Sequence, residues 1–426
     1  MTLNIALLGF GTVAQGVPFL LNENKEKIEQ AVGTNVEISK ILVLESSKER
    51  LEKQFDHNFV TRIEDIVDDS EIDIVIELIG RIEPAKTYIT KALKSGKHVV
   101  TANKDLLATH GQELISIAET NDVSLYYEAA VAGGIPILRT LANSLNSDKI
   151  TKVLGIVNGT SNFMMTKMVD EGWSYEEALK TAQELGFAES DPTNDVDGID
   201  AAYKMVILSQ FAFGMNIEVD QVSKTGIRNI SPEDVEMAAK LGYVIKLVGS
   251  IEEVESGLFA QVSPVFIPKG HALASVNNEM NAVYVESIGI GESMYYGPGA
   301  GQRPTATSVV ADIINIGKEI QAEIPAHPFN QFKRETVLAN PDDIKSKYYF
   351  ALEVPDKNGQ ILKLSEIYND TEISFAQVFQ QGSNGSTARV VIITHEMTQK
   401  QLHEVTEKIE SVPEFKLLNS FKVLGA

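Results

Sequence analysis

The sequence predicts an α/β protein that begins with a parallel sheet, continues as an α+β region and ends with a βαββαβ segment. Three observations support this fold class. Residues 1–131 alternate short apolar runs with amphipathic stretches, residues 132–318 lose that alternation, and residues 346–426 contain six elements in the order strand, helix, strand, strand, helix, strand. Continuous apolar strands that alternate with helices are typical of a parallel sheet covered on both faces.

Five apolar runs in the first region are expected to be strands. They are Ile5–Leu8, Ile38–Leu44, Ile72–Ile79, His98–Thr101 and Ser124–Val131. The amphipathic stretches between them predict helices near 12–30, 63–69, 84–95 and 106–121.

The second region mixes helices and strands. Helices are expected over Ile135–Leu145 and near 160–171, 174–186 and 197–215, and strands over Ile150–Asn158 and near 243–251, 258–267 and 282–288. Ser231-Pro232-Glu233-Asp234 is a strong helix start, with Ser at the N-cap and Pro in the first turn. A glycine-rich loop at 297–301 leads into a helix near 304–318.

The last region follows residues 319–345, which contain three prolines and scattered charges and are interpreted as a linker. Strands are expected over 347–354, 374–381, 387–394 and 415–424, and helices over 359–369 and 398–411. This order is the split-βαβ arrangement.

Composition excludes several classes of protein. The 426 residues include no cysteine, which rules out a disulfide scaffold, a thiol nucleophile and cysteine-ligated metal. A net charge of −22 makes binding to nucleic acid or to an anionic membrane unfavourable. The N-terminus lacks a basic region and a cleavage site, and the longest uncharged apolar run, Met205–Ile217, is too short to span a bilayer. A cytoplasmic protein is expected.

A glycine loop directly follows the first predicted strand. Its residues, Gly9-Phe10-Gly11-Thr12-Val13-Ala14, match the G-x-G-x-x-G/A pattern between a strand and a helix. Gly9 permits a tight turn, Gly11 lets the backbone approach a pyrophosphate, and the helix N-terminus offers free N–H groups to phosphates. An ordinary glycine turn is the alternative, but the context favours a Rossmann-type dinucleotide site.

Glu45 is expected at the end of the second strand. An acid at this place accepts a hydrogen bond from a ribose 2′-OH and repels a 2′-phosphate, which favours NAD over NADP. Glu45 lies further from the glycines than the usual ~20 residues, so a solvated surface acid is an equal alternative. Lys48 and Arg50 nearby could instead hold a 2′-phosphate.

The densest chemical signal lies between Leu185 and Lys204, in LGFAESDPTNDVDGIDAAYK. Asp197 is expected to cap the helix that follows, and Asp200 and Lys204, at i and i+4, share one face of it. That helix is otherwise apolar, so its lysine needs a carboxylate partner. A surface acidic loop with an ordinary helix pair is the alternative.

A second lysine, Lys104, stands just after the predicted strand His98–Thr101. Ligands of open α/β sheets bind at the carboxyl ends of the strands, so Lys104 is a candidate site residue. An exposed loop lysine is the alternative.

At this point the sequence resembles the homoserine dehydrogenases of the long bacterial type, over essentially the whole chain. The resemblance rests on TANK at 101–104, EAAVAGGIP at 128–136, NGTSNF at 158–163 and, above all, residues 185–204. Residues 346–426 resemble an ACT domain. The resemblance implies reversible, NAD(P)H-dependent reduction of L-aspartate 4-semialdehyde to L-homoserine, in the biosynthesis of threonine, methionine and isoleucine.

The resemblance also implies roles for single residues. Lys204 is the acid/base residue, Lys104 assists it and contacts the cofactor, and Asp195 helps to place Lys204. Glu189 and Asp200 bind the substrate, and Gly186 and Gly301 line the nicotinamide side of the cofactor. Glu128, Val131, Gly133 and Ile135 match a site for a monovalent cation such as Na⁺, for which a plain strand-to-helix turn is the alternative. Two close lysines are expected to lower each other's pKa.

The resemblance further predicts the assembly. The domains are expected as 1–131 for the dinucleotide, completed by helix 304–318, then 132–318 for catalysis and dimerisation, the linker 319–345, and 346–426 for regulation. A homodimer or homotetramer is expected, with threonine as the effector of the ACT-like segment. Leu44 stands where many relatives carry an arginine for the 2′-phosphate, so the choice between NAD and NADP stays open. A dehydrogenase of another amino-acid semialdehyde, or a non-catalytic amino-acid sensor, are the alternative functions.

Overall fold

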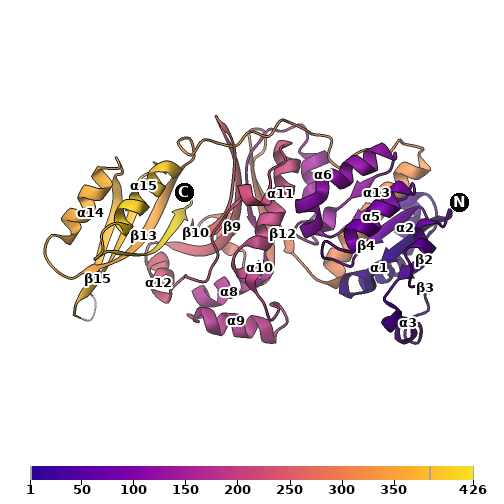
Figure 1. Ribbon diagram of the computed structural model, residues 1–426, viewed down its shortest axis with the longest axis horizontal. Helices are drawn as coiled ribbons and strands as arrows, with labels where there is room; N and C mark the ends of the chain where they lie inside the picture. The colour runs from indigo at the N-terminus through magenta and orange to yellow at the C-terminus, as the bar shows by residue number, and fades with distance from the viewer. Residues whose placement is uncertain (1, 383–384, 426) are drawn as a thin grey trace.

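The protein is elongated, with three groups of elements arranged along its length (Figure 1). The structure is a computed structural model and describes residues 2–382 and 385–425. The N-terminal sheet and its helices lie at one end, the central helices and long strands in the middle, and the C-terminal strands and helices at the other end.

The N-terminal sheet has six parallel strands in the order β3-β2-β1-β4-β5-β6, which confirms the predicted parallel sheet. The strands are β1 Leu3–Leu8, β2 Val36–Leu42, β3 Phe59–Val60, β4 Ile74–Glu77, β5 His98–Thr101 and β6 Leu125–Tyr126. The helices are α1 Thr12–Glu23, α2 Lys25–Val32, α3 Glu45–Glu52, α4 Glu64–Val67, α5 Ala85–Lys94 and α6 Lys104–Thr120. The strand order reverses between β1 and β4, so a crevice for a ligand is expected above these two strands.

Helix α13, Gln302–Gln321, returns from the middle of the chain to this sheet and packs on α1 and α2. Close approach depends on glycine: a Cβ on Gly16 of α1 would lie 2.6 Å from the Gln302 carbonyl oxygen. The helix expected near 304–318 is therefore present, three residues longer at its C-terminal end.

A second sheet of eleven strands runs through the other two groups. Its main order is β12-β11-β7-β9-β10-β17-β13-β15-β14, with β8 beside β10 and β16 beside β13. The strands are β7 Ile150–Ile156, β8 Ser223–Lys224, β9 Tyr243–Val254, β10 Gly257–Pro268, β11 Met280–Ser287, β12 Gly291–Pro298, β13 Lys345–Pro355, β14 Phe375–Gly382, β15 Thr387–Thr394, β16 Met397–Thr398 and β17 Lys416–Val423. The helices of these regions are α7 Ile137–Arg139, α8 Gly159–Asp170, α9 Tyr175–Glu184, α10 Thr193–Val196, α11 Ile199–Phe213, α12 Pro232–Lys240, α14 Gln360–Asn369 and α15 Gln399–Glu410.

The C-terminal segment has the predicted βαββαβ order, with the short strand β16 added before its second helix. Its last strand, β17, pairs in parallel with β10, so the sheet continues from the central region into this segment. Phe266 of β10 stacks on Tyr349 of β13, with ring centroids 4.4 Å apart. The two regions thus share one sheet and an aromatic contact.

The expected linker is packed against the protein. Phe329 is buried, Asn330 donates to the Gln210 carbonyl at 2.7 Å, and the Arg334 backbone N–H donates to the Gly214 carbonyl at 2.7 Å. Gln210 and Gly214 lie at the C-terminal end of α11. Residues 322–344 therefore form a strap that ties this end of α11.

Several predicted boundaries were wrong. The run Ser124–Val131 forms a strand only over Leu125–Tyr126, because the 3₁₀ turn Glu128–Ala130 follows. The second strand ends at Leu42, so Glu45 starts α3 instead of ending a strand. Asp197 does not cap α11: Gly198, at φ +78°, is the N-cap residue, and the Asp197 carboxylate pairs with Arg228 at 2.6 Å. Strand β12 was not predicted.

Candidate active site

A cavity of about 510 Å³ lies where the carboxyl edge of the N-terminal sheet meets α11. Its walls include Val13 at the start of α1, Lys104 at the start of α6, and Asp200 and Lys204 on α11. Gly186, Asp195 and Gly301 line it as well. Segments that are far apart in the sequence therefore meet around one space.

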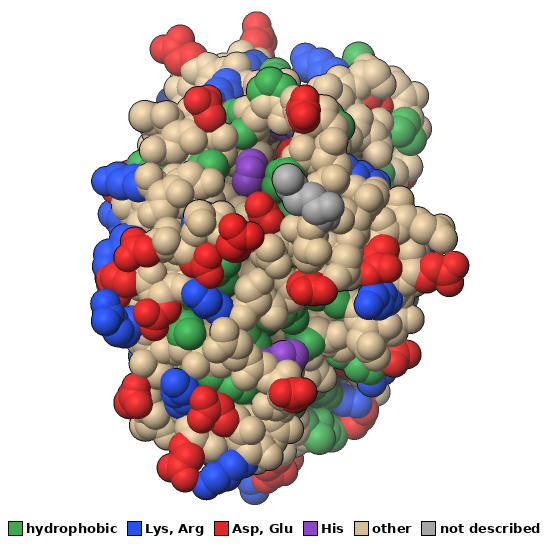
Figure 2. Space-filling view, turned by 90° about the vertical axis from the view of Figure 1, so that its right-hand side faces the viewer, with side chains coloured by type: hydrophobic (Ala, Val, Ile, Leu, Met, Phe, Trp, Pro, Cys, Tyr) green, Lys and Arg blue, Asp and Glu red, His purple; other side chains and the backbone are tan. Residues whose placement is uncertain are grey.

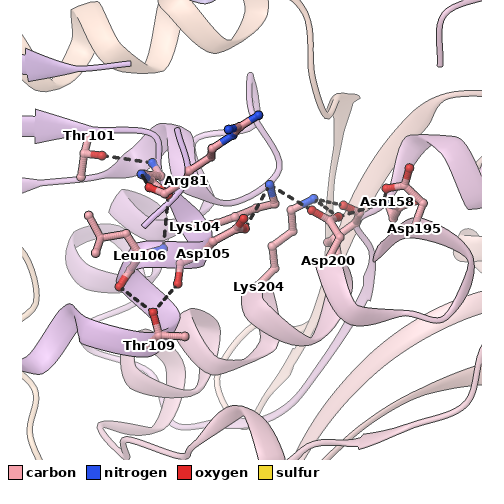
Figure 3. A network of polar contacts seen from close by, with 12 residues as sticks. Arg81, Thr101, Lys104, Asp105, Leu106, Thr109, Asn158, Asp195, Asp200 and Lys204 are labelled. Carbon is pink, nitrogen blue, oxygen red and sulfur yellow. Dashed lines mark hydrogen bonds and ion pairs between the residues drawn. The ribbon is translucent and has the colours of Figure 1, made fainter. Parts of the chain in front are cut away.

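Two lysines share one carboxylate in this cavity (Figure 3). The Lys204 Nζ donates to Asp200 Oδ2 at 2.7 Å, and the Lys104 Nζ lies 3.2 Å from Asp200 Oδ1. The Asp200 and Lys204 side chains are each 10% exposed, as their places one turn apart on an apolar helix predicted. The structure therefore brings together three of the predicted site residues.

Asn158 contacts the carboxylates of Asp200 and Asp195 beside the two lysines. It ends the segment after β7 and caps α8, where its Oδ1 accepts from the Ser161 backbone N–H at 2.8 Å. Its Nδ2 lies 2.7 Å from Asp195 Oδ1 and 2.9 Å from Asp200 Oδ2 (Figure 3). Lys204 also donates to the Val157 carbonyl at 2.5 Å. Asn158 is not among the site residues predicted from the sequence, although an Asn after a buried strand is a recognisable N-cap signal.

The charges of the group compensate one another. Burial alone would raise the pKa of Asp200, but Lys204 and Lys104 outweigh it and lower the pKa to about 2. Burial would lower the pKa of Lys104, but Asp200 and Asp105 raise it above its ordinary value. The expected mutual lowering is therefore wrong for Lys104, because a carboxylate lies between the two ammonium groups. Burial raises the pKa of Asp195.

The turn before Lys104 is built from buried polar groups. The Glu77 carboxylate, which is fully buried at the end of β4, accepts from the Thr101 hydroxyl at 2.7 Å and from the Ile79 N–H at 2.7 Å. Asn103 caps α6, accepting from the Leu106 N–H at 3.2 Å. Lys104 therefore starts its helix from a rigid support at the strand ends.

The glycine loop lies at the same edge. Gly9 has φ +92°, a Cβ on Gly11 would meet nothing within 4 Å, and α1 begins without a side-chain cap. The first N–H groups of α1, from Thr12 and Val13, are thus open to a phosphate. Among the residues of the glycine loop, Phe10 has a side chain that turns into the core, where its ring is buried against Phe55 and Phe59.

Of the remaining residues predicted to bind cofactor or substrate, some line the cavity and others lie outside it. Gly186 and Gly301, at φ +76° and +118°, line the cavity. Glu45 is exposed in the first turn of α3, just after the strand whose Leu42 carbonyl accepts from the Gly9 N–H. Glu189 is exposed and is not part of the cavity wall, so the structure does not bring it together with Asp200.

The segment expected to hold a cation is mostly buried. The Glu128 carboxylate accepts from the Leu138 and Arg139 N–H groups, each at 2.8 Å, and burial raises its pKa to about 7. The Gly133 carbonyl accepts from the Ser308 hydroxyl at 2.6 Å, and Val131 and Ile135 are buried. Within residues 2–382 and 385–425 no three His, Asp or Glu side chains are grouped as metal ligands.

The parallel sheet, the glycine loop and a cavity with two lysines at the strand ends define an NAD(P)-dependent oxidoreductase. The comparisons identify its family. Residues 9–128 match the family model for the homoserine dehydrogenase NAD binding domain, and residues 136–314 match that for homoserine dehydrogenase. The chain belongs to the homoserine dehydrogenase family.

Similar proteins support this assignment over the whole chain. The homoserine dehydrogenase of Lactococcus lactis is 60% identical over 100% of both chains, and that of Bacillus subtilis is 42% identical over 96% of this chain and 95% of its own. A crystal structure of the Thiobacillus denitrificans enzyme superimposes with a TM-score of 0.94 at 36% identity, covering 100% of this chain and 98% of the other. A hyperthermophilic archaeal enzyme in complex with NADPH matches 74% of this chain and 98% of its own at 28% identity, with a TM-score of 0.63.

No helix in the described part of the chain is long and apolar enough to cross a membrane.

Proposed function

We propose that the two-lysine cavity is where L-aspartate 4-semialdehyde is reduced to L-homoserine, with Lys204 as the acid/base residue. The observation that carries this proposal is the buried series Lys204–Asp200–Lys104, with Nζ-to-carboxylate distances of 2.7 and 3.2 Å. The two ammonium groups, held beside the Asp200 carboxylate, place positive charge at the wall of the cavity. Such a charge stabilises an oxygen that becomes negative during the reaction.

The residues at the strand ends fit a nicotinamide dinucleotide. The uncapped start of α1 and the open space beside Gly11 suit a pyrophosphate, and Val13, Gly186 and Gly301 line the adjoining cavity. The cofactor supplies the hydride when it is bound. The chain then has to bind both molecules, exclude water and deliver a proton.

Lys204 performs the proton transfer in this proposal. Its Nζ donates a proton to the aldehyde oxygen during reduction, and its neutral form accepts that proton in the reverse direction. Asp200 and the Val157 carbonyl hold the Nζ in place. Lys104 supplies the second positive charge, and Asn158 orients Asp200 and Asp195.

The substrate ammonium is proposed to bind at the carboxylates of this loop. Asp200 lines the cavity, while Glu189 lies in the exposed segment just after the wall residues Gly186 and Phe187. For the cofactor, Glu45 is proposed to accept a hydrogen bond from the adenosine ribose. This arrangement favours NAD over NADP.

Glu128 and the carbonyls of Val131, Gly133 and Ile135 are proposed to hold a monovalent cation such as Na⁺. A melting temperature that is higher in sodium than in choline chloride of equal ionic strength would support this site, and equal melting temperatures would remove it.

The division into domains is also a proposal: 1–131 with α13 for the cofactor, 132–318 for catalysis and dimerisation, 319–345 as connector, and 346–426 as an ACT-like regulatory unit. Sedimentation measurements test the expected dimer or tetramer, and a monomer would contradict it. Assays with threonine test the effector, and unchanged rates would exclude threonine.

Replacing Lys204 by Ala tests the reaction directly. We expect NADH or NADPH to bind as before, while turnover of aspartate semialdehyde falls by about 10²–10⁴-fold, the usual contribution of a positioned acid/base group. Lys240→Ala is the control, because Lys240 is an exposed lysine that pairs with Glu236 on α12. Turnover retained in Lys204→Ala would remove Lys204 from the acid/base role.

A further inference from the structure

We propose that Arg81 binds the pyrophosphate of the dinucleotide from the side opposite the glycine loop. The inference rests on the proposed position of the cofactor at Gly9–Val13. It adds a side chain to a phosphate site that otherwise consists only of backbone N–H groups.

Arg81 lies where a bound pyrophosphate is expected. It follows β4, and β4 is the strand beside β1 at the point where the strand order reverses. Ligands of open α/β sheets bind at this crevice. The loops after the two strands touch, because a Cβ on Gly9 would lie 3.3 Å from the Leu78 carbonyl oxygen and 3.2 Å from the Ile79 side chain.

The turn that carries Arg81 is held in an unfavourable conformation. Arg81 has φ +63°, directly after Gly80 at φ +78°. A residue with a Cβ loses free energy in this region, where glycine would not, so the surrounding structure must maintain it. The Glu77 carboxylate accepts from the Gly80 N–H at 3.0 Å, and Asn103 donates to the Arg81 carbonyl at 2.6 Å. The turn is thus fixed to the N-cap of the helix that begins with Lys104.

The guanidinium group is available to a ligand. Arg81 is exposed, and none of its contacts in the described part of the chain is an ion pair. In Figure 3 the dashed line at Arg81 ends on its backbone, and the Arg81 side chain extends away from the polar contacts that join Lys104, Asp200 and Lys204.

The chemistry of this arginine suits a diphosphate. The glycine loop has no basic residue, so α1 alone would face two negative phosphates. A guanidinium offers paired N–H donors and a permanent charge, which match phosphate oxygens. Ile79 and Ile82, 38% and 37% exposed, flank it with apolar surface.

The test is a binding titration with NADH and with NADPH in the absence of substrate. The fluorescence of the nicotinamide ring reports how much cofactor is bound. In Arg81→Gly, which also relieves the positive φ, we expect the Kd of both cofactors to rise by the same factor of about 10, while kcat at saturating cofactor stays within two-fold. Arg81→Lys should recover part of the affinity. Arg62→Ala, which removes an exposed arginine paired with Glu64, is the control for net charge.

Each other result would overturn the proposal. Unchanged Kd values, relative to Arg62→Ala, would show that Arg81 does not reach the cofactor. Weakening of NADPH alone would place Arg81 at the 2′-phosphate, and a fall in kcat at unchanged Kd would place it at the reacting atoms. Because the titration needs no turnover, its result does not depend on the role of Lys204.

Discussion

The Asp200 carboxylate decides the electrostatics of the active site at the scale of single residues. It separates Lys204 from Lys104, so two buried ammonium groups share one anion, and its pKa falls to about 2. The i, i+4 spacing of Asp200 and Lys204 predicted their contact from the sequence. The place of Lys104, almost 100 residues earlier, depended on the fold.

Glu45 is the residue on which we expect cofactor choice to depend. In Glu45→Ala the KM for NAD should rise more than the KM for NADP, because the variant loses an acceptor for the ribose 2′-OH and also loses the repulsion of a 2′-phosphate. Parallel assays with the two cofactors measure the ratio. An equal change for both would make Glu45 a bystander.

Lys246 predicts a pH dependence of stability. Its Nζ, inside the central sheet, donates to the Val276 carbonyl at 2.7 Å and to Asn277 Oδ1 at 2.9 Å, and burial lowers its pKa from 10.5 to about 8. Between these pH values the unfolded chain holds a proton that the folded chain has lost, so the free energy of unfolding rises with pH. The gain is at most about 3 kcal/mol.

Urea unfolding of wild type and Lys246→Met at pH 7.5 and pH 10 measures this effect. The wild type should gain stability relative to the variant as the pH rises. Parallel pH dependences of the two proteins would show that Lys246 stays charged in the folded state.

Helix starts show what can be learned at the scale of elements. Ser231 caps α12 as predicted, and the capping box with Asp234 is complete, with Ser231 Oγ 3.2 Å from the Asp234 N–H. Ser174 caps α9 with the same type of box, at a more exposed position. Such caps are visible in sequence because their residue types and spacing are local.

The two caps give a matched comparison. Ser174→Ala should cost about 1 kcal/mol of unfolding free energy, the usual value for a cap. Ser231→Ala should cost more, because Asp234 also receives hydrogen bonds from Tyr349 at 2.8 Å and from Asn419 at 2.6 Å. Denaturant unfolding measures both variants, and a smaller loss at Ser231 would contradict the wider role of Asp234.

At the scale of the whole molecule, one continuous sheet joins the central and C-terminal regions. The Asp234 cluster, comprising Asp234, Ser231, Tyr349, Arg389 and Asn419, lies at this junction, and Asp234 is fully buried. The strap 322–344 makes a second connection, past the C-terminal end of α11, and its trace joins the two regions in Figure 1. The surface at the end of the molecule that holds the N-terminal sheet carries both acidic and basic side chains (Figure 2).

Asp234→Asn should loosen this junction. It removes the buried carboxylate that pairs with the partly buried Arg389 and leaves that guanidinium only the more distant, exposed Glu233 at 4.0 Å. Breaking a buried ion pair costs about 3 kcal/mol in other proteins. Limited proteolysis within 322–344 should become faster, and the free energy of unfolding should fall. Lys400→Ala, which removes an exposed pair with Asp342, is the control. Proteolysis no faster than in this control would show that the junction does not depend on the cluster.

The sequence by itself determined the local features of this protein. Most of the order of strands and helices, the glycine loop, the cap at Ser231 and the face shared by Asp200 and Lys204 follow from residues a few positions apart. Only the tertiary structure decided that Asn158 meets Asp200, that the Asp200 carboxylate lies between Lys104 and Lys204, that 319–345 is packed, that β17 joins β10, and that the loop leading to Arg81 touches the glycine loop. Those contacts depend on how buried sheets and helices pack across the chain, and periodicity within one segment carries no information about them.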